Sequence, residues 1–265
     1  FLGDWDAFLA SLQQMGGAVK WLGTYGIQFF DRPIIGGIIF LLPVMGLFAT
    51  TACVLRRRTK SHWLWVPLAA WLAVAQLLSL YDFNFYWWGA LALCLAMGVL
   101  WFWSLLKPSL TRNILFAFSI PFIAWLLGAV VLVYVLAGIC LFVDKKSWKL
   151  AWLVPVTLYI VSVAFFYVGN RCPSLMVAVS PMMYFEPLLD ISYYHLVTWV
   201  MTVLVWGGCR WLPMAEKKVW VWCICIVSWI LPAGVLLQYG GTFRNQSNID
   251  LWRLNHYAYT ENWDG

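Results

Sequence analysis

Residues 33–54 form the run PIIGGIIFLLPVMGLFATTACV, which contains no charged side chain. As a helix, this run is long enough to cross the hydrocarbon core of a bilayer, which is about 30 Å thick. Further apolar runs occur at residues 62–81, 84–106, 113–143, 148–169, 195–211 and 219–239. These runs are continuous rather than alternating, which favours helices over a transmembrane barrel. We therefore expect an all-α fold, a polytopic transmembrane helix bundle of about 7–8 spans.

The composition of the whole chain supports the same class. Hydrophobic residues make up 63% and charged residues 11% of the sequence, whereas soluble domains average about 45–50% and 25%. The net charge of +6 comes from basic residues in short loops between the apolar runs. This distribution is an orientation signal of membrane proteins rather than a nucleic-acid surface. We expect membrane lipids as the surroundings and no nucleic acid as a partner.

The segment Phe1–Arg32 runs into the first span without a linker. It breaks at Gly16-Gly17 into two amphipathic pieces, which we expect to lie in the plane of the membrane. At the other end, the chain turns polar after the last apolar run and then begins an amphipathic pattern. The expected organisation is an interfacial segment at 1–32, a helix bundle at 33–239, and a linker with the start of a soluble helical region at 240–265.

The basic loops predict the orientation. Arg56–Arg58 and Lys60 belong in the cytoplasm by the positive-inside rule. A single crossing at 113–143 would put Lys145 and Lys146 outside, which weakens the charge asymmetry. A hairpin of two short halves turning near Gly128 puts every basic cluster inside. One long tilted helix at 113–143, with 173–189 crossing or re-entering, restores most of the asymmetry. Both of these last arrangements put the first segment and the tail outside; the resemblance described below implies a bacterial inner membrane, in which that side is the periplasm.

The interiors of the apolar runs carry no Asp, Glu, Lys or Arg. Lys149 and Arg210 lie close to the ends of their runs. Coupled transporters usually carry ionisable groups at membrane depth, so a transporter is disfavoured, although a site built from backbone carbonyls would escape this test. Gln76 is the main polar group inside a run. The seven cysteines lie mostly in apolar runs and form no CxxC motif, so we expect free thiols. Cys172 is the one that lies in a loop.

Two sets of residues are candidates for chemistry outside the membrane. Asp4-x-Asp6 could hold a divalent cation or supply a catalytic carboxylate, although acids are also common in a first helical turn. Glu186, Asp190 and His195 lie in a proline-broken loop and could supply acid/base chemistry, or be simple loop charges. No phosphate-loop, dinucleotide or hydrolase motif is present, and we identify no cofactor.

The opening Asp4-Trp5-Asp6-Ala7-Phe8-Leu9, with Gly16-Gly17 and Gln28-Phe29-Phe30 after it, resembles an uncharacterised family of bacterial multispanning inner-membrane proteins. In that family a helical-repeat region follows the membrane part, and the tail Leu251–Gly265 is similar to the entry into it. The resemblance implies no established activity.

The layout also resembles the GT-C glycosyltransferases, in which an acidic residue of the first outside loop acts on a lipid-linked sugar. Asp4 or Asp6 would match that residue. The basic cluster expected to hold a lipid phosphate outside is missing here. Three functions follow as hypotheses: a GT-C-like transferase acting on a lipid-linked substrate, a non-enzymatic scaffold that binds a protein partner through its C-terminal helical region, and a transporter.

Overall fold

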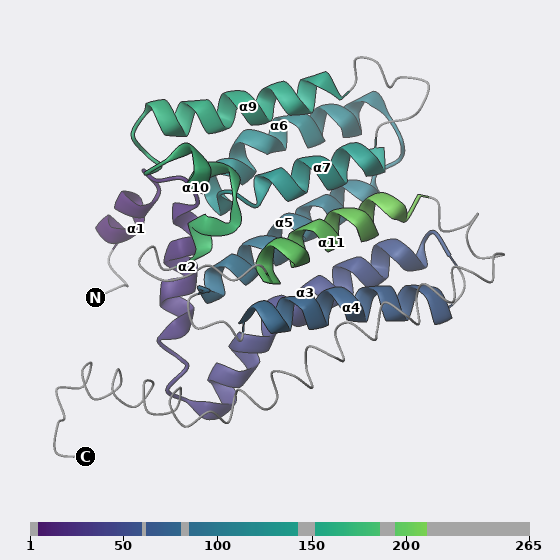
Figure 1. Ribbon diagram of the computed structural model, residues 1–265, viewed down its shortest axis with the longest axis horizontal. Coiled ribbons are helices and arrows are strands. Elements are labelled where there is room, and N and C mark those ends of the chain that lie inside the picture. The colour runs from purple at the N-terminus through teal and green to yellow at the C-terminus, as the bar shows by residue number, and fades with distance from the viewer. Residues whose placement is uncertain (1–4, 60–61, 81–84, 143–151, 186–193, 211–265) are drawn as a thin grey trace. The chain divides into compact units, whose positions relative to one another are not determined.

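The computed structural model describes residues 5–59, 62–80, 85–142, 152–185 and 194–210 (Figure 1). All of them belong to one compact unit, Phe1–Val221. In chain order the elements are α1 Trp5–Ser11, α2 Gly17–Ile27, α3 Pro33–Arg56, α4 His62–Leu80, α5 Trp87–Leu105, α6 Leu110–Leu127, α7 Val131–Phe142, α9 Leu153–Val168, α10 Leu175–Val179, the 3₁₀ helix η2 Pro181–Tyr184, and α11 Tyr194–Gly208. The expected all-α helix bundle is confirmed. In these ranges β pairing is limited to the isolated bridge between Phe85 and Phe185.

The helices differ in length relative to a bilayer. Among the described residues, α3, α5 and α6 are long and apolar enough to cross a membrane. The other apolar helices of the bundle are shorter, at Trp65–Leu80, Val131–Phe142, Leu153–Val168 and His195–Gly208. Each of the predicted runs between 33 and 211 therefore contains helix, and the run 219–239 lies outside the described residues.

The bundle has two distinct ends. At the basic end, α3 finishes at Arg56 and α6 begins with Arg112 in its first turn. At the opposite, capped end, α1, α2, α10 and η2 lie across the bundle; Figure 1 shows α2 crossing the direction of the neighbouring helices. Successive long helices run alternately between these ends, as spans of a membrane protein do.

The run 113–143 is a hairpin of two helices, which decides between the arrangements left open by the sequence. Gly128 ends α6 with a φ of 86°, and α7 begins at Val131. The guanidinium of Arg112 lies 4.6 Å from the ring centre of Phe142, so the start of α6 and the end of α7 meet at the basic end. The turn near Gly128 therefore lies at the capped end, as the hairpin arrangement predicted.

The surface differs from that of a soluble protein. Large apolar side chains are exposed along α3, α6, α9 and α11, for example Ile34, Phe118, Val168 and Leu204. Soluble monomers rarely expose apolar surface on this scale. The interior is mostly apolar but also contains hydrogen bonds between helices: Ser79 and Thr198 hydroxyls lie 3.0 Å apart, and Trp206 Nε1 donates to Thr51 Oγ1 at 3.1 Å. Polar side chains of this kind hold helices together in lipid, where apolar burial gives no net attraction.

Candidate functional site

The predicted outside residues are only partly described. Asp4, Glu186 and Asp190 lie outside the described residues. Asp6 lies in the first turn of α1 and is exposed. Within the described ranges no three His, Cys, Asp or Glu side chains form a group that could hold a metal ion. The roles assigned to these acids, and the divalent cation at Asp4 and Asp6, stay predictions.

His195 is enclosed by aromatic rings at the start of α11. Its side chain is 0% exposed, and its ring centre lies 4.0 Å from that of Phe85 and 5.6 Å from that of Trp199. Tyr184 and Phe185 complete the enclosure at 6.1 Å and 6.2 Å. Neither ring nitrogen has a hydrogen-bond partner in the part of the chain that is described. Acid/base catalysis requires hydrogen-bond reach to a substrate, and this packing offers none. The catalytic role of His195 stays a prediction that this geometry does not favour.

The first segment is fixed to the capped end by backbone groups. The break at Gly16-Gly17 is confirmed, because α1 ends at Ser11 and α2 begins at Gly17. The amide of Gly16 donates to the carbonyl of Trp125 at 2.8 Å, and Trp125 Nε1 donates to the carbonyl of Leu12 at 2.7 Å. Val19 of α2 is fully buried, because α2 packs on α5 and α6.

Cys172 also lies at the capped end. It is a free thiol, as expected, but its side chain is buried. Burial raises the pKa of the Cys172 thiol above its ordinary value. Because the thiolate is the reactive form of cysteine, this environment makes Cys172 a poor nucleophile.

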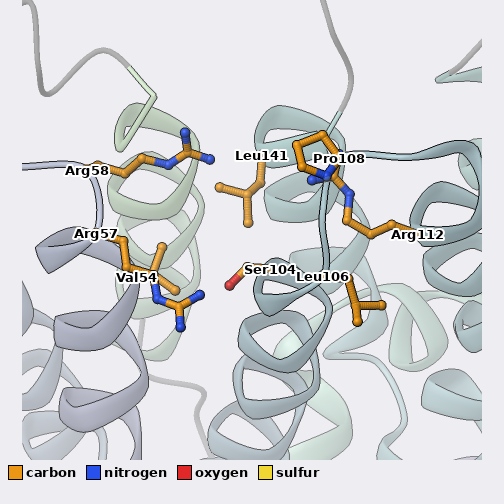
Figure 2. A pocket seen from close by; sticks show the side chains of 8 residues that line it. All are labelled: Val54, Arg57, Arg58, Ser104, Leu106, Pro108, Arg112 and Leu141. Carbon is orange, nitrogen blue, oxygen red and sulfur yellow. The ribbon is translucent and has the colours of Figure 1, made fainter.

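A concave site lies at the basic end of the bundle. A cavity of about 240 Å³ is lined by three arginines, one hydroxyl and four apolar residues: Arg57, Arg58, Arg112, Ser104, Val54, Leu106, Pro108 and Leu141. Figure 2 shows Arg57 and Arg58 approaching from the end of α3, while Arg112 approaches from α6. We call this site the arginine cavity.

Local structure places the two α3 arginines. After α3 ends, the amides of Arg58 and Thr59 both donate to the carbonyl of Leu55, at 2.8 and 3.0 Å. This turn keeps Arg57 and Arg58 over the last turn of the helix, and it buries the side chain of Thr59. All three consecutive arginines are exposed, but only Arg57 and Arg58 line the cavity, and Arg56 does not.

Arg112 is placed by the start of α6. The hydroxyl of Ser109 accepts a hydrogen bond from the amide of Arg112 at 3.2 Å and caps the helix. The Arg112 side chain is only 8% exposed, and its guanidinium lies over Phe142 and donates to Asn113 Oδ1 at 3.4 Å.

Among the described residues that line the cavity, the charged ones are all arginines. None of the residues that line it is acidic. The acids within the described ranges are Asp6 and Asp31, and both lie in or next to the first segment, at the other end of the bundle. The N-terminus of α6 adds a partial positive charge. The chemistry that fits such a site is recognition of an anion with several oxygens, because guanidiniums bind phosphate and carboxylate oxygens through paired N–H groups.

The sequence predicted only part of this site. The arginine triplet was evident as a basic loop, but Arg112 was counted only as a cytoplasmic charge. The Ser109 cap and the proline before it are the available signals, because together they predict that Arg112 falls in a first helical turn on the same side of the membrane.

A comparison with known protein families shows to which family the chain belongs. A model for a family of unknown function, DUF6057, matches residues 1–265. The chain belongs to DUF6057. The expectation that it belongs to an uncharacterised family is thereby confirmed, whereas the GT-C layout stays a prediction. No curated protein matches this DUF6057 member significantly, and no solved structure does.

Proposed function

We propose that this DUF6057 member is a multispanning membrane protein that binds a phosphate-bearing anion in the arginine cavity. The observation that carries the proposal is the convergence of Arg57, Arg58 and Arg112 on one cavity without a lining carboxylate. Charge-assisted hydrogen bonds from arginine to phosphate are among the stronger interactions available to a protein. A site of this composition is well suited to phosphate and poorly suited to a cation or a neutral ligand.

The exposed apolar helix faces and the three candidate spans support a membrane location. We propose the inner membrane of a bacterium, with the basic end in the cytoplasm and the capped end in the periplasm, because basic loops are retained on the cytoplasmic side. The arginine cavity then opens at the inner surface of the membrane, where phosphate-bearing metabolites and lipid headgroups are both available.

A second candidate function is a GT-C-like transferase acting on a lipid-linked substrate at the outer face. One observation favours this transferase hypothesis: the first segment packs on the helices at the capped end. Asp4 or Asp6 would then act at the membrane surface. The scaffold hypothesis depends on 240–265, which lie outside the described residues, and a transporter remains third.

Ligand-induced stabilisation of the purified protein tests the proposal. A ligand present at ten times its Kd raises the free energy of unfolding by about 1.4 kcal/mol. We expect inorganic phosphate or pyrophosphate, or a phosphate-bearing lipid, to raise the thermal midpoint of the natural protein and not that of the R57Q/R58Q variant. Arg56→Gln is the matched control, since Arg56 belongs to the same loop but does not line the cavity. If none of these compounds stabilises the natural protein, the proposal is wrong.

A further inference from the structure

We infer that the occupant of the arginine cavity is a small organic phosphate whose carbon part is a short chain without hydroxyl groups. This inference rests on the proposed anion-binding function and names the class of ligand. Four features carry it: the exposure of the two α3 arginines, the apolar inner wall, the few hydrogen-bonding groups beside that wall, and the size of the cavity.

The phosphate group belongs beside the two arginines at the end of α3. Arg57 and Arg58 are exposed, and both side chains extend toward the cavity (Figure 2). Arg112 contributes less, because its guanidinium is already engaged by Asn113 and by the ring of Phe142. A phosphate held by two exposed arginines keeps part of its hydration, so binding does not require a fully buried charge. The anionic group therefore lies on the open side of the cavity.

The inner wall of the cavity is aliphatic. Val54 and Leu141 line the cavity although their side chains are only 3% and 6% exposed, so they lie on its inner side. Leu106 and Pro108 also line it, and both are exposed. A ligand with its phosphate at the arginines therefore places its carbon atoms against aliphatic side chains. Each methylene group buried in this way tightens binding through the hydrophobic effect.

The cavity offers few hydrogen-bonding groups to the carbon part of a ligand. Apart from the arginines, the hydroxyl of Ser104 is the polar side-chain group among the lining residues that are described. It donates to the carbonyl of Trp101 at 2.6 Å, so toward a ligand it acts as an acceptor. Pro108 has no amide hydrogen, and the amide of Leu106 donates to the carbonyl of Trp103 at 3.2 Å. A sugar phosphate or glycerol phosphate would bury hydroxyl groups without enough partners, which weakens binding.

The size of the cavity sets an upper limit on the ligand. Its volume of about 240 Å³ is smaller than the range of about 300–1,000 Å³ that is typical of pockets for drug-sized ligands. None of the described lining residues is aromatic, so a nucleotide base would find no ring on which to stack. We therefore expect a phosphate that carries a chain of a few carbon atoms.

The experiment measures the binding of a series of phosphates to the full chain in phosphatidylcholine nanodiscs, by isothermal titration calorimetry. The series consists of inorganic phosphate followed by methyl, ethyl, propyl, butyl and hexyl phosphate. Each methylene group that enters the cavity should tighten binding by about fourfold. The gain should stop when the chain fills the cavity, so that hexyl phosphate binds no more tightly than butyl phosphate. Glycerol phosphate has the same number of carbons as propyl phosphate, and we expect it to bind at least about fivefold more weakly.

Variants at the rim of the cavity localise the carbon part. L106A truncates a lining side chain that is 37% exposed, so the change does not disturb the core. L105A is the matched control, because Leu105 is 39% exposed and does not line the cavity. We expect L106A to weaken binding of butyl phosphate at least about threefold and to leave binding of inorganic phosphate unchanged. L105A should change neither.

A second pair of variants tests the inner wall. V54A enlarges the cavity, so hexyl phosphate should bind more tightly than butyl phosphate in this variant. V44A is its control, since Val44 belongs to the same helix and is also buried but does not line the cavity. R57Q/R58Q should weaken binding of every phosphate in the series by about tenfold or more, because both charged partners are lost.

The outcomes separate this inference from the proposed function. If inorganic phosphate binds as tightly as butyl phosphate, or glycerol phosphate as tightly as propyl phosphate, the inference is wrong and the anion site stands. If L105A acts like L106A, or if affinity for the natural protein still rises from butyl to hexyl phosphate, the chain lies outside the cavity and the inference is again wrong. If no phosphate of the series binds, both the inference and the proposed function fail.

Discussion

Gly16 and Gly128 face each other at the capped end with no side chain between them. A methyl group built on Gly16 would lie 3.1 Å from the Cα of Gly128, and one built on Gly128 would lie 3.3 Å from the Cα of Gly16 and 2.6 Å from Met183 Sδ. The first of these glycines separates α1 from α2, and the second ends α6 in the α6–α7 hairpin. The docking of the first segment and the turn of the hairpin therefore depend on the same contact.

Replacing Gly128 with alanine should destabilise the bundle. Gly128 has a φ of 86° and a ψ of −145°, a conformation almost restricted to glycine that costs a residue with a side chain about 1–3 kcal/mol, and the contact with Met183 adds to this. We expect a loss of about 2 kcal/mol or more in the free energy of unfolding, measured by denaturation in detergent. Gly98→Ala is the control, because no atom lies within 4 Å of its methyl position. Alanine there should leave stability unchanged or raise it, and equal losses for both variants would contradict the contact.

Tyr184 holds the hairpin turn from the other side. Its hydroxyl donates to the carbonyl of Leu127 at 2.7 Å and accepts from the amide of Val130 at 2.9 Å, and the side chain is buried. Tyr184→Phe leaves both backbone groups without this partner, which costs about 1–3 kcal/mol. Thermal unfolding should show the loss. Tyr25→Phe, at an exposed site on α2, should change the midpoint little; if the two variants behave alike, the hydroxyl does not support the turn.

The hydrogen bond between Ser79 of α4 and Thr198 of α11 should couple the two helices. A double-mutant cycle with S79A and T198V is expected to give a coupling free energy of about 0.6–1.7 kcal/mol, the range for polar contacts between membrane helices. Thr50 bonds only to carbonyls of its own helix. A cycle that pairs S79A with T50V should therefore give a coupling free energy near zero.

His195 distinguishes a packed side chain from a catalytic one. His195→Leu removes two buried nitrogens that have no partner among the described residues, at similar volume. Since an unsatisfied buried polar group costs about 1–3 kcal/mol, we expect the thermal midpoint to stay the same or rise. The cellular phenotype supplies the second measurement. If the variant folds normally but fails to complement a deletion, that result supports the acid/base role of His195. D4N/D6N in the same assay tests the transferase hypothesis, which predicts complete loss of function.

Reporter fusions test the orientation in the membrane. With the hairpin at the capped end, fusions after Asp82, Glu186 and Asn248 should report the periplasm, and a fusion after Lys146 the cytoplasm. This pattern follows from the positive-inside rule together with the hairpin. A periplasmic signal at Lys146 would mean that α6 and α7 do not both span the membrane. A cytoplasmic signal at Asn248 would remove the geometry of the transferase and scaffold hypotheses.

Much of the fold could be predicted because its causes are local. The uncharged run 33–54 is a helix in the structure, since a backbone in lipid must satisfy its own hydrogen bonds. The break at Gly16-Gly17 was predictable from the glycine pair. The hairpin at 113–143 was one of two arrangements that the basic residues allowed, and charge counting could not separate them. The turn at Gly128 distinguishes the hairpin from a single long helix. It is closed by the positive φ of Gly128 and by two hydrogen bonds of the Tyr184 hydroxyl.

By itself, the sequence determined the all-α class and which end of the bundle is basic, because hydropathy and loop charge act residue by residue. Only the tertiary structure decided which of those charges share a cavity. Arg56 and Arg57 are exposed neighbours in the chain, yet after the turn that follows α3 only Arg57 lines the cavity. Arg112 joins Arg57 and Arg58 because the start of α6 returns to the end of α3. Likewise, the sequence places His195 in a proline-broken loop, whereas the structure buries its side chain among aromatic rings from distant segments. Convergence of this kind depends on long-range packing, which no local pattern encodes.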